Sequence, residues 1–198
     1  MQINKIIRNK KFLLILLVLN LIGIFTSAYT YLQHIEFYIS QGELFIIPFF
    51  AVSFWLFFFA FLFILYLYLD LKIPLLFGGM SFIYVFVYGI GSFLFYPLYM
   101  IFVDGFSSYH TWNIFAHGFV GLQAFLFLYC LNKPKKSHFF ALGIIFIFKN
   151  YLDLFKDGFL YFLDNNFPFM LKIFLYILIG SLQITAFYLL WKLDKRLK

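Results

Sequence analysis

The feature that most constrains this chain is a series of long stretches without a charged residue. A helix needs about 20 apolar residues to cross the hydrocarbon core of a bilayer, because each residue adds about 1.5 Å. Hydrophobic residues make up 65% of the 198 residues and charged residues 12%, against about 45–50% and 25% in a soluble domain. The sequence therefore predicts a single integral membrane domain over residues 1–198.

The predicted fold is an all-α, polytopic transmembrane bundle of six spans. Helices are expected because a lipid-embedded segment must pair its own backbone polar groups, and the short alternating segments of a barrel are absent. Pro97 is expected to kink or end the third span, which is longer than a straight crossing. The fifth span must continue past Lys149 and Asp153 to cross, and Asp157–Leu171 is predicted to be an interfacial loop. The predicted spans are Phe12–Thr30, Leu44–Leu69, Ile73–Val103, Trp112–Leu131, a span beginning at Ser137, and Ile173–Trp191.

The lysine and arginine residues predict the orientation of these spans. With six crossings, twelve of the 15 basic residues lie on the side of the two termini, and three lie opposite: Lys149, Lys156 and Lys172. Because basic residues accumulate in cytoplasmic segments, both termini are predicted to be cytoplasmic in a multi-pass protein of the cell membrane. The basic clusters are expected to contact anionic lipids, and their spacing between apolar runs does not indicate nucleic-acid binding.

The N-terminal run allows a second interpretation, a cleaved signal peptide. Thr26, Ser27 and Ala28 offer small residues of the kind found at cleavage sites. The uncharged stretch from Phe12 to Gln33 covers 22 residues, which suits a membrane span better than a signal sequence. It is therefore predicted to be retained.

Polar residues inside the predicted spans are the candidates for a site, because burying them in lipid is costly. Asn20 and Gln123 are interpreted as interhelical hydrogen-bonding residues. Asn150 and Asp153 are three residues apart and share one helix face. The short Asn132–Ser137 loop predicts that the fourth and fifth helices are antiparallel neighbours, with His117 and Asp153 both ~23–24 Å from the cytoplasmic end.

His117 is therefore predicted to face Asp153 or Asn150. Such a site could pair charges, relay a proton or bind a cation. The alternative is that these residues are simply hydrated near the outer surface.

Standard catalytic motifs are absent from the sequence, so whether the chain is an enzyme stays open. A single cysteine, Cys130, excludes an internal disulfide and a cysteine-based metal site, and no metal or cofactor is predicted. A haem held by two histidines would need His34 or His138 as one of its ligands, and neither residue is predicted to lie at a suitable depth in the membrane. Gly78-Gly79 and Gly89-x-Gly91 are interpreted as points where neighbouring helices approach closely.

Two functions are compatible with these observations. The first is a non-enzymatic accessory, assembly or small carrier protein, which could also bind another membrane protein. The alternative is a membrane-embedded enzyme, or a cation or proton translocator, that uses a His117/Asn150/Asp153 polar site.

The chain resembles the YpjA-like family, a domain of unknown function found in uncharacterised prokaryotic multispan membrane proteins. The resemblance covers most of the chain as scattered short matches. It implies a multispan membrane fold and no established activity, substrate or cofactor. The matching positions are Asn20-x-x-Gly23, Tyr29, Tyr31, Pro48, Tyr88-Gly89, His117, Gln123, Asn150, Asp153 and Gly158.

Overall fold

A computed structural model of the chain contains helices and no strands among the residues that it describes, which are 7, 9–40, 42, 44, 51–155 and 168–193. The helical elements are α2 (Lys10–Ser40), α4 (Val52–Tyr68), α5 (Leu75–Tyr84), η2 (Val85–Ile90), α6 (Gly91–Tyr99), η3 (Met100–Asp104), α7 (Ser108–Cys130), α8 (Lys136–Phe155) and α9 (Phe169–Lys192). The predicted helical class is therefore confirmed.

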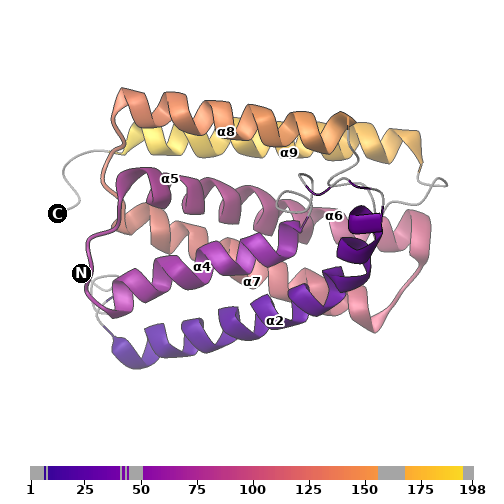
Figure 1. Cartoon of the computed structure of the whole chain (residues 1–198), viewed down its shortest axis with the longest axis horizontal. Coiled ribbons are helices and arrows are strands. Elements are labelled where there is room, and N and C mark those ends of the chain that lie inside the picture. The colour runs from indigo at the N-terminus through magenta and orange to yellow at the C-terminus, as the bar shows by residue number, and fades with distance from the viewer. Residues whose placement is uncertain are drawn as a thin grey trace.

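The helices lie side by side along the long axis of the molecule (Figure 1). Successive rods run in opposite directions, so α2 begins and α9 ends at the same end of the bundle. Among the described residues, four helices are long and apolar enough to cross a membrane: Lys10–Leu32 within α2, Leu75–Asp104, α7 and α9. The 17-residue α4 is shorter, and α8 carries Lys149 and Asp153.

The predicted spans match these helices with local differences. Helix α2 continues to Ser40, ten residues beyond the predicted end at Thr30. Helix α4 covers most of the predicted Leu44–Leu69 span, of which residues 45–50 lie outside the described residues. Helix α9 begins at Phe169, inside the predicted Asp157–Leu171 loop, and residues 157–167 of that loop also lie outside the described part of the chain.

The elements α5, η2, α6 and η3 form one continuous rod, Leu75–Asp104, called here the central helix. It does not end at Pro97, because α6 continues through this residue and passes into the π-helical turn η3. A second π-helical turn, η2, lies in the middle of the rod, where widening of the helix shifts the direction of the side chains that follow. The residues from Phe82 to Gly89 are buried, so the middle of the central helix forms the core of the bundle.

Glycine residues allow the central helix to pack closely against its neighbours, as the sequence predicted. A Cβ atom on Gly89 would lie 2.5 Å from the Cα atom of Gly121 on α7, so the two backbones are in direct contact. A Cβ atom on Gly79 would lie 2.9 Å from Leu142 of α8, and one on Gly91 would lie 3.0 Å from Ile179 of α9.

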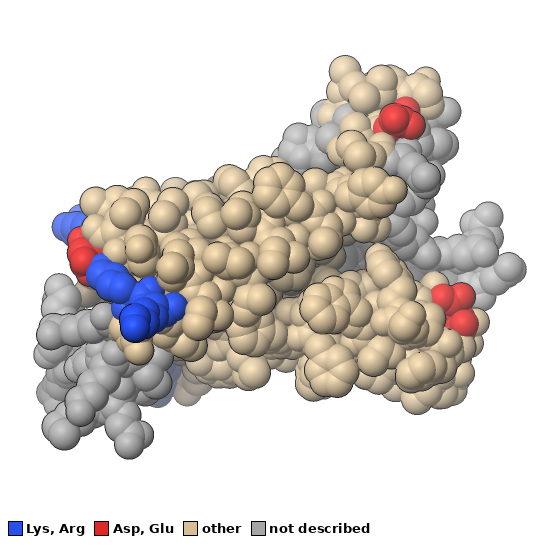
Figure 2. Space-filling model, turned by 90° about the horizontal axis from the view of Figure 1, so that it is seen from below, with Lys and Arg blue, Asp and Glu red and all other residues tan. Residues whose placement is uncertain are grey.

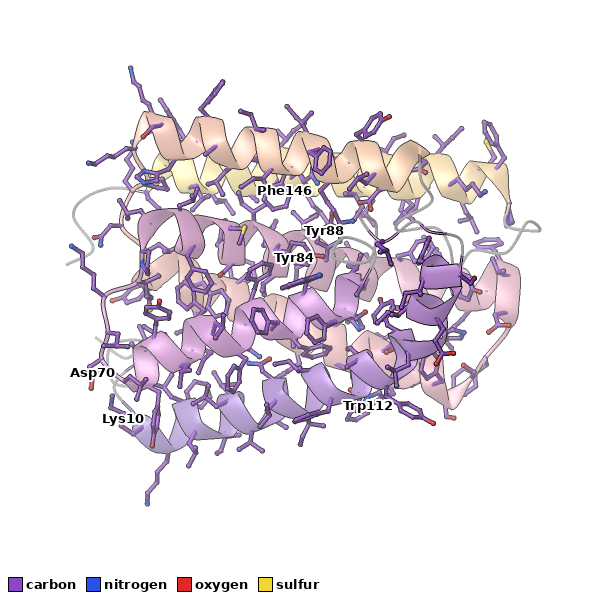
Figure 3. The ribbon with its side chains drawn as sticks, viewed as in Figure 1. Lys10, Asp70, Tyr84, Tyr88, Trp112 and Phe146 are labelled. Atoms are coloured by element: carbon purple, nitrogen blue, oxygen red, sulfur yellow. The ribbon has the colours of Figure 1, made fainter. Side chains whose placement is uncertain are left out.

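The outer surface of the bundle is apolar between its two ends. Figure 2 shows an uncharged band over the length of the molecule, with the lysines of this face gathered at one end. At that end Lys10 of α2 forms an ion pair of 2.5 Å with Asp70, which follows α4 (Figure 3). Large apolar side chains that are exposed on the described helices include Ile22, Phe25, Leu122, Phe125, Ile177 and Ile184.

Candidate functional site

A cavity of about 600 Å³ lies between α2, α4, α6 and α7. This volume falls within the range of small-molecule sites, about 300–1,000 Å³. Its lining is mainly apolar, and rings of phenylalanine, tyrosine and tryptophan make up a large part of it. The aromatic lining residues are Tyr31, Phe57, Phe95, Tyr96, Tyr99, Tyr109, Trp112, Phe115 and Phe119.

Two polar side chains of α7 line this cavity with an unsatisfied nitrogen atom. Nδ1 of His110 and Nδ2 of Asn113 are buried, and neither has a hydrogen-bond partner among the described residues. His110 is only 9% exposed. A buried polar group without a partner costs about 1–3 kcal/mol, so these two atoms lower the stability of the bundle beside the cavity.

The turn between η3 and α7 positions His110. Gly105 adopts a φ of 73°, which a residue without a Cβ tolerates, and the chain reverses there. The hydroxyl of Ser107 caps α7 by accepting a hydrogen bond of 3.1 Å from the backbone N–H of His110. Nε2 of His110 then lies 2.6 Å from Oδ2 of the exposed residue Asp104. Since the carboxylate accepts this bond, Nδ1 is the ring nitrogen that has no partner among the described residues.

His117 lies two turns further along α7, and both of its ring nitrogens have hydrogen-bond partners. Its Nδ1 lies 2.9 Å from the backbone oxygen of Asn113, and its Nε2 lies 2.9 Å from Oγ of Ser53 on α4. Ser53 in turn donates its backbone N–H to the hydroxyl of Tyr31 on α2, over 3.3 Å. The ring of Tyr96 contacts both His110 and His117, with centroid distances of 5.8 and 5.6 Å. These bonds connect three helices beside the cavity.

The predicted pairing of His117 with Asp153 or Asn150 is therefore wrong, because both ring nitrogens bond elsewhere. Asn150 exchanges two hydrogen bonds with Gln183 of α9, at 2.8 and 2.9 Å. Asp153 binds Lys149 and accepts a bond of 3.4 Å from the hydroxyl of Tyr88. Figure 1 gives the reason: the central helix lies between α7 and α8, so a short loop joins helices that are not neighbours at this depth.

Lys149, Asp153 and Tyr88 form a second polar group on the other side of the central helix. The side chains of the ion pair are 6% and 8% exposed, and the ammonium group lies 5.3 Å from the centroid of the Tyr88 ring. Figure 3 shows Tyr88 between the central helix and α8. A cavity of about 110 Å³ adjoins this group and is lined by Tyr88, Asn150, Asp153, Leu175, Tyr176, Ile179 and Gly180.

Asn20 and Gln123 bond to each other, so the predicted interhelical hydrogen bonds are present. Nδ2 of Asn20 donates to Oε1 of Gln123 over 2.9 Å, and Nε2 of Gln123 donates in return over 3.4 Å. Both side chains are buried, which places a satisfied amide pair between α2 and α7. Neither residue lines the large cavity, and their two hydrogen bonds join α2 to α7.

Sequence reasoning missed Ser53, His110 with Asp104, and Gln183. Gln183 is the one amide side chain in the predicted span Ile173–Trp191, so the sequence could have indicated it. No comparable pattern in the sequence marks Ser53 or Asp104. Within the described part of the chain, no group of three or more His, Cys, Asp or Glu residues could hold a metal ion.

Comparison of the chain with protein-family models, curated proteins and solved structures finds no match. The chemistry of the two cavities therefore carries the functional argument.

Proposed function

We propose that the chain is a six-span protein of the cell membrane with both termini in the cytoplasm. The alternating directions of the helices and the four apolar helices support this topology. At 1.5 Å per residue α4 is roughly 26 Å long, close to the hydrocarbon thickness of about 30 Å. Helix α8 can cross because Lys149 and Asp153 neutralise each other. Membership of the YpjA-like family stays a prediction supported by the motifs quoted above.

The proposed orientation places anionic lipids at the lysine-rich end. The described basic residues at this end can contact lipid headgroups, whereas Glu36 near the end of α2 and Asp104 at the end of η3 lie at the opposite end. The lysine-rich set comprises Lys10, Lys11, Lys72, Lys133, Lys135, Lys136 and Lys192.

The function that the geometry supports best is that of a non-enzymatic carrier or accessory protein that holds one lipophilic molecule. The observation that carries this proposal is the cavity of about 600 Å³, whose wall is mainly apolar and rich in aromatic side chains. The apolar body of such a ligand would pack against the aromatic side chains that line the cavity. The cavity lies between helices that we propose to span the membrane, so a molecule dissolved in the bilayer could reach it.

Mass spectrometry of the protein purified in mild detergent tests this function. Ala116→Trp places a large ring in the cavity wall, and Leu122→Trp adds the same ring to a position of α7 that is 62% exposed on the apolar surface. We expect a lipophilic molecule to co-purify with the wild type and with Leu122→Trp, and to be lost from Ala116→Trp. Equal recovery from the two tryptophan variants, or no bound molecule in the wild type, would contradict the proposal.

A second candidate function is proton or cation translocation. The observation that favours it is the buried Lys149–Asp153 pair beside the cavity of about 110 Å³, since ionisable residues within a span often mark a translocation path. A pH-sensitive dye inside proteoliposomes would measure proton flux. If the protein is a translocator, we expect the wild type to show proton flux and Asp153→Asn to abolish it. Absence of flux in the wild type would exclude this second function.

A further inference from the structure

The large cavity has an open side, which lies between α2 and α7. The residues of α4 and α6 that line the cavity are buried or half-buried, so these two helices form its floor. On α7, the lining residues Trp112 and Phe115 are instead 64% and 67% exposed, and Ile22 of α2 is 50% exposed. Residues that line a cavity and are also exposed lie on its rim, so the cavity opens onto the apolar surface of the bundle.

The opening is long and follows the helix axes. Its lining on α2 extends from Leu19, next to the Asn20–Gln123 pair that joins α2 to α7, as far as Tyr31. At 1.5 Å per residue this lining covers ~18 Å along the helix. The cavity is called here the lateral groove, with an inner end near Asn20 and an outer end toward Asp104. A groove of this shape can hold a long molecule that lies parallel to the helices.

Polar and apolar residues separate along the lateral groove. Near the outer end most lining side chains carry a polar group, including Thr30, Tyr31, Tyr99, Tyr109 and Asn113. Near the inner end most lining residues are apolar, namely Leu19, Ile22, Gly23, Phe57, Phe119 and Val120. Val52 and Ser92 are the exceptions at the outer and inner ends. The groove therefore matches an amphiphile whose polar head lies at the outer end and whose apolar chain points inward.

The charge and volume of the lateral groove restrict this amphiphile further. No lysine, arginine, aspartate or glutamate among the described residues lines the groove. A charged head group would lack a counter-ion there, and burial of an unpaired charge is costly, so an uncharged head is favoured. The volume of about 600 Å³ lies in the range of sites for one small molecule, which favours a single chain over a two-chain lipid.

We infer that the lateral groove binds one uncharged, single-chain amphiphile from the bilayer, of the class of long-chain alcohols and monoacylglycerols. The molecule enters sideways between α2 and α7. Its chain packs against the apolar inner lining, and its head lies at the outer end among the polar side chains. This inference rests on the proposed carrier function and names the chemical class and the orientation of the ligand.

Bromine quenches tryptophan fluorescence at short range, so brominated probes report where each end of the ligand lies. One protein carries Trp55→Phe and Trp191→Phe, which leaves Trp112 as its only tryptophan. A second protein also carries Trp112→Phe and Phe119→Trp, which moves the reporter ~10 Å toward the inner end. We expect saturable quenching in mild detergent. The tail bromine of 12-bromododecan-1-ol should quench the inner reporter more strongly, and the head bromine of 2-bromododecan-1-ol should quench Trp112 more strongly.

Competition against the brominated alcohol identifies the head group. Monododecanoylglycerol is uncharged, dodecanoate is anionic and dodecyltrimethylammonium is cationic, and the three compounds have chains of equal carbon number. Amounts are compared as mole fractions in the detergent micelles. We expect the uncharged compound to displace the probe at a roughly tenfold lower mole fraction than either charged compound, because the groove offers no counter-ion.

Substitutions assign the binding to the lateral groove. Ala116→Phe adds a ring to the groove wall and should weaken binding by roughly tenfold, since added volume in a packed site is poorly tolerated. Leu122→Phe is the matched control on the exposed surface of α7 and should leave binding unchanged. Elution volume in size-exclusion chromatography identifies a variant that has failed to fold. In that case Thr26→Phe, at an exposed position on the α2 side of the groove, replaces Ala116→Phe.

Four results would overturn the inference: quenching that does not saturate, stronger quenching of Trp112 than of the inner reporter by the tail bromine, equal or better competition by a charged compound, or equal binding to Ala116→Phe and Leu122→Phe. If a lipophilic molecule co-purifies in an Ala116→Trp-sensitive manner while the brominated alcohols do not bind, the carrier function stands and only the ligand class is wrong. If neither is observed, both proposals fail.

Discussion

Oγ of Ser53 lies 2.9 Å from Nε2 of His117, and this bond joins α4 to α7 beside the large cavity. The other ring nitrogen of His117 is fixed by the backbone oxygen of Asn113, a carbonyl that can only accept. In the neutral ring, Nδ1 therefore carries the hydrogen, and Nε2 accepts from the serine hydroxyl. The bond holds His117 in one tautomer and one orientation.

Loss of the Ser53 hydroxyl should destabilise the protein because Nε2 of His117, a side chain that is 2% exposed, would lose its partner. We expect Ser53→Ala to lower the free energy of unfolding by about 1–3 kcal/mol, measured by denaturation in mild detergent. The double variant Ser53→Ala/His117→Phe should cost less than the sum of the single variants. Additive costs would show that the two side chains are not coupled.

The hydrogen bonds between Asn20 of α2 and Gln123 of α7 should also stabilise the protein, because loss of either side chain leaves the other amide without a partner. Asn20→Leu leaves the buried amide of Gln123 unpaired, and we expect a loss of about 0.6–2 kcal/mol, the range for interhelical bonds in membranes. Asn20→Leu/Gln123→Leu should recover part of this loss, since no polar group then stays unsatisfied. A double-mutant cycle on unfolding free energies measures the coupling, and a double variant less stable than both single variants would contradict this account.

Charge-free runs were sufficient to predict the helices because the cost of burying charge dominates every other local signal in this chain. They placed α2, the central helix, α7 and α9 within a few residues, apart from the extension of α2 to Ser40. They could not show that the central helix passes through Pro97, which lies inside α6.

The sequence could not show which helices contact one another. Residues 131–135 connect α7 to α8 without helical structure, and that length allows the chain to pass the end of the central helix. The depth count for His117 and Asp153 assumed that the two helices touch. The contact of His110 with Asp104 depends on the reversal at Gly105, a tertiary feature with no periodic signal.

The direct backbone contact between Gly89 and Gly121 predicts a strong response to the smallest side chain. A Cβ on Gly89 would lie 2.5 Å from Gly121 Cα, and backbone atoms cannot move aside as a flexible side chain can. We expect Gly89→Ala to lower the melting temperature measurably, with a cost of about 1–3 kcal/mol or more. Gly143→Ala is the matched control, because its Cβ would meet nothing within 4 Å and should be tolerated. Equal melting temperatures would contradict the close approach.

The orientation of the bundle can be tested with single cysteines in a Cys130→Ala background. Glu36→Cys and Lys135→Cys introduce exposed thiols at opposite ends of the described bundle. A membrane-impermeant maleimide added to intact cells should label Glu36→Cys, and should label Lys135→Cys only after the cells are opened. Labelling of Lys135→Cys from outside would reverse the orientation inferred from the basic residues.

Substitutions of Lys149 and Asp153 can show whether their ion pair has a structural role or a role in translocation. Both side chains are buried, so removal of one charge leaves the other without a partner, and we expect Asp153→Asn to cost about 3–5 kcal/mol. Lys149→Met/Asp153→Leu removes both charges while keeping apolar volume. It should be nearly as stable as the wild type, because replacing a buried ion pair by apolar residues often preserves stability.

If the pair only packs α8 against the central helix, this double variant should retain every function of the wild type. If the pair carries protons or cations, the double variant should fold, give a normal melting temperature, and show no flux in proteoliposomes. Melting temperature and flux, measured on the same three proteins, therefore decide between the two roles, and a double variant less stable than Asp153→Asn would contradict both.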